Sequence, residues 1–152
     1  MQVDFYQVSR DPPEAIVAML AEKTLAAGQR LLVVAAEAPR LEAIGQALWA
    51  HPGRGGAASF LANGRAGAGH EPRQPILLSE TVDPANGARF VVLADGVWRD
   101  EAADPVRFDR AFLVFDAATL EDARACWRIL GAREGLTRNF WKQDAGRWIK
   151  AA

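Results

Sequence analysis

An indole flanked by two guanidinium groups is the arrangement in this sequence whose residue types and spacing indicate chemistry. Trp127 follows Arg124 by three positions and precedes Arg128 by one. On a helix that advances about 100° per residue, Trp127 lies within the apolar face and the two arginines lie along one edge of that face. Arginine offers a planar fork of donors that suits carboxylates, and tryptophan offers a broad apolar wall. The spacing favours binding of a peptide that carries an aromatic side chain and a free carboxylate.

A structural role is the alternative for the same helix. In that interpretation Trp127 packs in the core, and the arginines pair with nearby carboxylates at the surface. The candidate carboxylates are Asp116, Glu121 and Asp122. Trp49 and Phe60 leave the same two interpretations open, because each stands at the end of an expected element beside a glycine-rich stretch, where binding sites tend to lie.

Motifs for catalysis and for metal binding are missing from the sequence. It contains no GxxxxGK[ST] phosphate loop, no GxSxG nucleophile turn and no HExxH spacing. The turn after the first expected strand, residues 9–13, lacks glycine and carries an acidic residue where a phosphate would lie. Cys126, in the middle of a helix, is typical of a small packing residue. We therefore expect a binding module with no catalytic residue, no metal and no cofactor.

The composition is typical of one domain that folds without disulfides. The chain has 152 residues, a net charge of −1 and a single cysteine. No apolar run reaches the roughly 18 residues of a membrane span, and the N-terminus lacks a signal-peptide pattern, so we expect a cytoplasmic protein. Residues 121–152 hold seven basic and four acidic side chains, a net +3 against −4 elsewhere. This basic end indicates a local patch for an anionic partner.

The hydrophobic pattern predicts an α/β architecture. Alternating or unbroken apolar runs predict strands at residues 2–8, 31–36, 58–61, 76–78, 90–93 and 111–115. Helices are predicted at 11–27, capped by Asp11, at 39–50 and at 118–133. Residues 63–71 are expected to form a mobile glycine-rich loop, and 140–148 either a hairpin or a capped turn. This order predicts a single domain over residues 1–152, a three-layer α/β/α sandwich with a mostly parallel sheet.

Short motifs, taken in order along the chain, resemble the family of chi subunits of bacterial DNA polymerase III. The matching pieces are Phe5-Tyr6, Leu41-Glu42 followed by Leu48-Trp49, Ser59-Phe60-Leu61, Gln74-Pro75-Ile76-Leu77-Leu78, Phe108 with Arg110, Ala123-Arg124 with Trp127-Arg128, and Trp141 with Gln143, Gly146 and Trp148. No single piece is specific. Their order and spacing across nearly the whole length carry the resemblance.

The resemblance implies a Rossmann-like α/β fold without catalytic activity. It implies binding of the acidic C-terminal tail of single-stranded DNA-binding protein, which ends in a phenylalanine with its free carboxylate. It also implies a link to the clamp loader, through a psi subunit in the family, and so an indirect contact with DNA in the nucleoid-associated replisome. The family positions that form the tail pocket match Trp49, Phe60, Arg124, Trp127 and Arg128, and Leu61 is taken as part of the wall.

The chain departs from the family at the expected pocket rim, and two other functions remain as alternatives. Ala62-Asn63 stands where the family has Pro-His, and residues 51–56 lengthen the loop between Trp49 and Phe60. A nucleotide-binding enzyme of Rossmann-like fold is one alternative, although the phosphate loop is missing. A module that binds single-stranded DNA directly through its five tryptophans is the other, although a net charge of −1 gives no general attraction for DNA.

Overall fold

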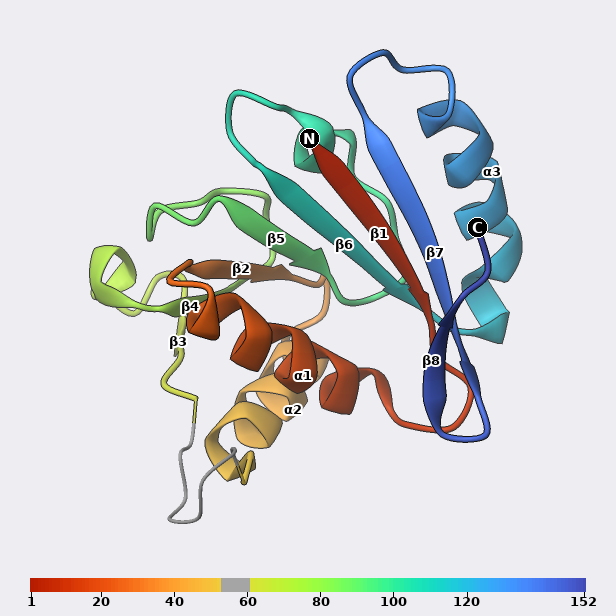
Figure 1. Cartoon of the computed structure of the whole chain (residues 1–152). Helices are drawn as coiled ribbons and strands as arrows, with labels where there is room; N and C mark the ends of the chain where they lie inside the picture. The colour runs from red at the N-terminus through yellow and green to blue at the C-terminus, as the bar shows by residue number, and fades with distance from the viewer. Residues whose placement is uncertain (53–60) are drawn as a thin grey trace.

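A single sheet organises the structure, a computed structural model that describes residues 1–52 and 61–152 (Figure 1). Within these residues eight strands pair in the order β3-β4-β2-β5-β6-β1-β7-β8. Their bounds are β1 Gln2–Gln7, β2 Leu31–Val34, β3 Gly64–Arg65, β4 Ile76–Ser79, β5 Phe90–Leu93, β6 Arg110–Phe115, β7 Thr137–Asp144 and β8 Arg147–Lys150. In this part of the chain every pair is parallel except β7 with β8. The mostly parallel, Rossmann-like sheet expected from the sequence is confirmed.

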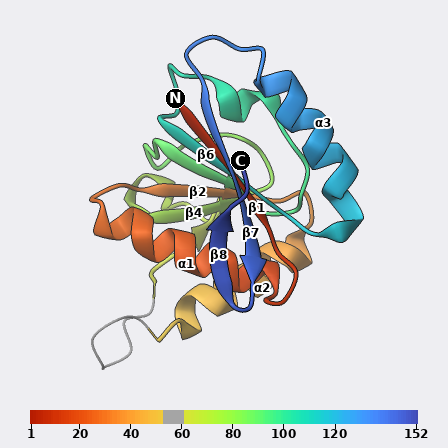
Figure 2. The same ribbon diagram turned by 45° about the vertical axis from the view of Figure 1, so that its right-hand side comes forward.

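Helices cover both faces of the sheet (Figures 1 and 2). Helices α1 (Pro13–Ala26) and α2 (Ala38–Ala50) pack on one face, and α3 (Leu120–Leu130) packs on the other. Three short 3-10 turns, η1 (Glu71–Arg73), η2 (Asp100–Ala103) and η3 (Ala117–Thr119), lie in the connections. Because side chains at successive strand positions point to opposite faces of the sheet, the core consists of two clusters, one on each face. Tyr6 belongs to the cluster under α1 and α2, and Phe5 to the cluster under α3.

Several local expectations are wrong. Asp11 does not cap α1: Pro12 holds the cap position without a side-chain hydrogen bond, and the Asp11 carboxylate accepts from Gln143 Nε2 at 2.7 Å instead. The Asp11 carboxylate, which the sequence pattern assigned to the first turn of α1, therefore accepts a hydrogen bond from a side chain of β7 instead. Residues 64–65 pair with β4 as a short strand within the expected loop. Of the strand expected at 58–61, Leu61 lies outside any strand, and 58–60 lie outside the described residues.

The C-terminal segment forms a hairpin, which decides between the two alternatives left by the sequence. Ala145 and Gly146 connect β7 to β8 with φ angles of 49° and 80°. Two successive positive φ angles are characteristic of the type I′ turn, whose twist matches that of the flanking strands. β7 also pairs in parallel with β1, from Gln2↔Thr137 to Gln7↔Lys142, so the hairpin extends the sheet beyond β1.

A buried carboxylate fixes the position of β7. Asp4 on β1 is fully buried. It accepts from Arg110 Nε of β6 at 2.7 Å, from Asn139 Nδ2 of β7 at 3.0 Å and from Trp141 Nε1 of β7 at 3.3 Å. Gln2 Nε2 donates to both carboxylate oxygens. Since a buried carboxylate is stable only when its lone pairs are satisfied, Asp4 holds β1, β6 and β7 in one register.

Replacement of Asp4 by Ala is expected to lower the free energy of unfolding by about 3 kcal/mol, the low end of the range for a broken buried pair, because Arg110 stays partly exposed to water. The free energy of unfolding of Asp4→Asn is expected to lie between those of the Ala variant and the wild type, since an amide keeps one acceptor oxygen. Urea unfolding followed by tryptophan fluorescence measures both variants. An unchanged unfolding midpoint in Asp4→Ala would contradict the role assigned to this carboxylate.

Candidate functional site

The sheet separates the residues predicted for the site into two groups. Trp127, between Arg124 and Arg128 on α3, packs against the core cluster of that face. Trp49 lies near the C-terminal end of α2, on the opposite face, and Leu61 belongs to the core cluster there. Phe60 lies outside the described residues. Among the described residues, Trp127 and Trp49 therefore lie on opposite faces of the sheet and do not line one shared pocket.

The group on the α2 face offers little to an anionic partner. Trp49 is 49% exposed and borders a shallow hollow of about 300 Å³ that Glu42 and Arg65 also line. Leu61 is buried, and its N–H donates to the Leu48 carbonyl at 2.9 Å. Among its described lining residues, one acidic and one basic side chain balance each other.

The indole of Trp127 is half-buried, and one of its faces is covered by an arginine. Its ring meets Phe5 and Phe140 edge-on, with centroids 5.3 Å and 5.6 Å apart. The Arg138 guanidinium of β7 stacks over the indole, with Cζ 4.1 Å from the ring centroid, and its Nη1 donates to the Trp127 carbonyl. Trp127 thus serves the core and the surface at once, and Arg138 is a cationic neighbour that sequence reasoning missed.

A glycine makes room for the Arg138 guanidinium. A Cβ atom built on Gly131, just after α3, would lie 2.6 Å from Arg138 Cζ and 2.6 Å from its Nη2. The backbone of Gly131 is ordinary right-handed helix, with φ −63°, so the requirement for glycine here is one of space.

The two arginines predicted on α3 differ in their pairing. Both are exposed. Arg124 Nη1 lies 3.1 Å from Glu121 Oε1, an exposed pair that contributes about 0–1 kcal/mol and is easily exchanged for another anion. Arg128 has no hydrogen bond or ion pair with any residue that the structure describes. The alternative in which carboxylates neutralise both arginines therefore holds for Arg124 alone.

Strand β7 adds further basic side chains on the face next to α3. Phe140 points to the core under α3, so Arg138 and Lys142, two positions away on either side, share its face. Ile149, which pairs with Lys142 across the hairpin, is 39% exposed on the same face. We call this the α3–β7 surface, formed by Arg124, Trp127, Arg128, Arg138, Phe140 and Lys142. In the sequence, the net charge of +3 over residues 121–152 indicates this basic surface.

The described residues show no cluster of metal-binding side chains, and the one cysteine is buried. No group of three or more His, Cys, Asp or Glu in this part of the chain is placed to hold a metal ion. Cys126 is buried on the inner side of α3. Burial, with a smaller effect from the charge of Asp100, raises the pKa of its thiol to about 12. Among the described helices, none has the length and apolarity that crossing a bilayer requires.

The Gly131→Ala variant is expected to fold, because its backbone is helical, and to push the Arg138 guanidinium off the Trp127 ring. In protein labelled with 5-fluorotryptophan, the ¹⁹F resonance of Trp127 should then shift, while the resonances of the other four tryptophans stay in place. Ala132→Ser, at the next exposed position, serves as the control. If the Trp127 resonance does not move in Gly131→Ala, the stacked arrangement of Arg138 is wrong.

Cys126 is expected to resist alkylation in the native protein. Because its pKa lies near 12, almost none of the buried thiol is ionised at pH 8, and the thiolate is the reactive form. Mass spectrometry after treatment with iodoacetamide should show unmodified protein under native conditions and complete modification in guanidinium chloride. Rapid native alkylation would show that the thiol is accessible and not the packing group described here.

Comparison with known proteins identifies the family. The family model described as DNA polymerase III chi subunit, HolC, matches residues 1–137 of the 152-residue chain. A search of curated proteins gave no match. The matched region contains β1 to α3 and ends at the first residue of β7, so most of the hairpin lies beyond it. The chain therefore belongs to the family of DNA polymerase III chi subunits, accessory subunits in DNA replication.

Proposed function

We propose that this protein binds the acidic C-terminal tail of single-stranded DNA-binding protein and links it to the clamp loader of DNA polymerase III. It acts without catalysis of its own, in the cytoplasm at the replisome, and contacts DNA through its partner. Membership of the chi family supports the role in replication. A psi subunit or the clamp loader itself is the second partner in this proposal.

The observation that carries the proposal is the α3–β7 surface. It combines four basic side chains with a partly exposed indole that Arg138 covers on one face, and the Arg128 guanidinium has no anionic partner among the described residues. A tail that ends in phenylalanine supplies a ring, a terminal carboxylate and upstream acidic side chains. We assign the terminal carboxylate to Arg128 and the ring to the exposed edge of Trp127. The upstream acidic side chains are assigned to Arg124 and Lys142.

The expected affinity follows from these few contacts. Burial of one aromatic ring contributes roughly 1.5–3 kcal/mol, and a charge-assisted hydrogen bond contributes about 1.5–3 kcal/mol more. After the cost of association, dissociation constants in the micromolar range are expected. Since the basic side chains are exposed, the affinity should fall as salt is added. Weak, reversible binding suits a tether that must release while the polymerase moves.

The Arg124→Ala/Arg128→Ala double variant is expected to weaken binding of a tail peptide about tenfold or more, because both changes remove cations without disturbing the core. Isothermal titration calorimetry measures the affinity, and thermal unfolding confirms the fold. Arg73→Ala, an exposed arginine on η1 away from α3, is the matched control and should bind as the wild type does. A tail peptide without its final phenylalanine should bind weakly to all variants.

Fluorine NMR of labelled tryptophans distinguishes tail binding at the α3–β7 surface from tail binding at the α2 face. In protein labelled with 5-fluorotryptophan, the tail peptide should shift the resonance of Trp127 and leave that of Trp49 unchanged. Unchanged affinity in the double variant, together with loss of binding in Trp49→Ala, would move the tail to the α2 face and overturn the assignment. Tight binding of a bare single-stranded oligonucleotide at moderate salt would instead favour direct DNA binding.

A further inference from the structure

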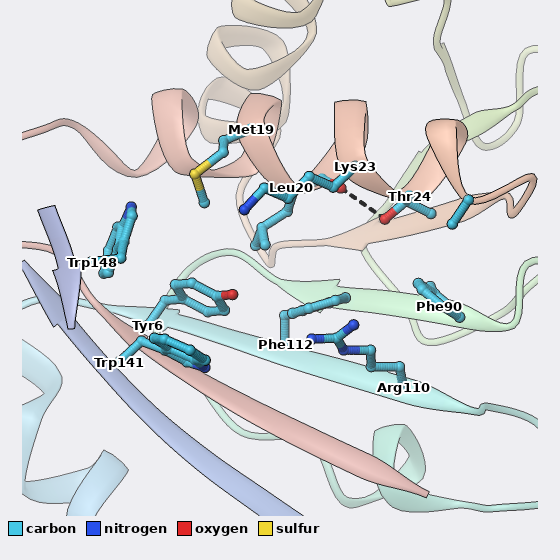
Figure 3. Close-up of a pocket in the computed structure, with 11 residues that line it drawn as sticks. Tyr6, Met19, Leu20, Lys23, Thr24, Phe90, Arg110, Phe112, Trp141 and Trp148 are labelled. Carbon is cyan, nitrogen blue, oxygen red and sulfur yellow. Dashed lines mark hydrogen bonds between the residues drawn. The ribbon is translucent and has the colours of Figure 1, made fainter. Parts of the chain in front are cut away.

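A second cleft lies on the face opposite the α3–β7 surface, between α1 and the strands near the hairpin (Figure 3). Its volume is about 310 Å³. Its walls are mostly aromatic and come from α1, β1, β5, β6, β7 and β8. The main lining side chains are Tyr6, Met19, Phe90, Phe112, Trp141 and Trp148. This volume is at the lower end of the range for ligand sites, so the cleft suits one ring and not a large cofactor.

The walls of the cleft are rigid because the rings support one another. Trp148 meets Tyr6 edge-on at 5.1 Å between centroids, and Trp141 stacks on Tyr6 at 6.3 Å. The Trp141 indole N–H already donates to Asp4. The polar edge of Trp141 is therefore satisfied inside the protein. Its apolar surface, like those of Met19 and Trp148, remains available in the cleft (Figure 3).

The Tyr6 hydroxyl points into this cleft and is accessible from it (Figure 3). Tyr6 is only 7% exposed, and its hydroxyl makes no hydrogen bond with any described residue. Figure 3 shows the hydroxyl directed between Leu20 and Phe112. Burial raises the pKa of Tyr6 to about 12, with the charge of Asp4 acting in the same direction, so the group is a protonated donor at neutral pH. The hydroxyl can therefore donate a hydrogen bond to an acceptor group of a ligand in the cleft.

Basic side chains stand at the same cleft, and no acidic side chain lines it within the described residues. Arg110 donates through Nε to Asp4 and lies over Phe112, with Cζ 4.9 Å from the ring centroid. Its two terminal amino groups have no hydrogen-bond partner in the described part of the chain. Lys23 of α1 is exposed and likewise has no ion-pair partner there. Donors and positive charge thus meet beside an apolar cavity.

We propose that this cleft is a second docking site, for a segment of a partner protein that inserts one aromatic side chain next to an acidic residue. The ring enters between Met19, Trp148 and Phe112, and the neighbouring carboxylate meets the Tyr6 hydroxyl and the free amino groups of Arg110. Lys23 attracts the acidic flank of the segment. This site is separate from the α3–β7 surface, since the sheet lies between them.

A protein segment fits the cleft better than single-stranded nucleic acid does. Nucleic acid needs a basic groove that follows several phosphates, with bases stacked in succession on open aromatic faces. Here the rings enclose one compact cavity, and the basic side chains that line it are Lys23 and Arg110. Charge and shape together match one ring with one adjacent carboxylate.

The test uses the full chain labelled with 5-fluorotryptophan, with the resonances assigned by Trp→Phe replacements. The probe is the acetylated peptide Gly-Asp-Trp-Asp-Gly. It should shift the resonances of Trp141 and Trp148 and leave Trp127 unchanged. Tyr6→Phe keeps the ring in the core and removes the hydroxyl, and should weaken binding about tenfold. Lys23→Glu should weaken it about threefold or more, whereas the matched reversal Arg73→Glu should have no effect.

Control probes make the outcome decisive. Equal binding of Gly-Ser-Trp-Ser-Gly would overturn the part of the proposal that requires a carboxylate. Absence of any shift at Trp141 and Trp148, or displacement of the peptide by oligothymidine, would overturn the proposal as a whole. The readout is independent of the proposed tail site, because failure of tail binding at Trp127 leaves the result at Trp141 and Trp148 unchanged.

Discussion

The buried carboxylate of Asp4 is the interaction on which both candidate surfaces depend. It receives donors from β6 and β7 while belonging to β1, so it joins three neighbouring strands at one point. Strand side chains alternate between faces, and a shift of one residue would exchange the two sets. With β7 held by Asp4, Arg138 and Lys142 face α3, and Trp141 faces α1. The hydrogen bonds of one buried carboxylate thereby help to set which side chains each face presents.

The two proposed docking surfaces share strand β7. One strand contributes cations to a surface beside α3 and an indole to a cleft beside α1. Each surface also draws on its own helix, through Arg128 on α3 and Lys23 on α1. Because the sheet is a continuous hydrogen-bonded layer between them, a partner on one side leaves the other side open.

Much of the fold was predictable from the sequence because its signals are local. The apolar run at 31–36 predicts a strand buried on both faces, and a period of 3.6 residues predicts that Trp127 lies on the apolar face of its helix with the two arginines at the edge. Which helix lies on which face of the sheet, and which side chains of different elements meet, was not predictable from such local signals. The family resemblance implies one pocket that contains both Trp49 and Trp127, but it does not show to which face each helix crosses, and the structure has the two helices on opposite faces. Arg138 was missed because its neighbour Trp127 belongs to another element.

The short edges of the sheet have a consequence for assembly. β3, at one end, has two residues, and β8, at the other, has four residues and carries Arg147 and Lys150. A long, flat, apolar edge strand exposes unpaired backbone groups that recruit strands from other chains, whereas brevity and charge discourage such recruitment. In the crowded surroundings of a multi-subunit machine, this protein is protected from uncontrolled sheet extension and is left to recognise its neighbours through side chains.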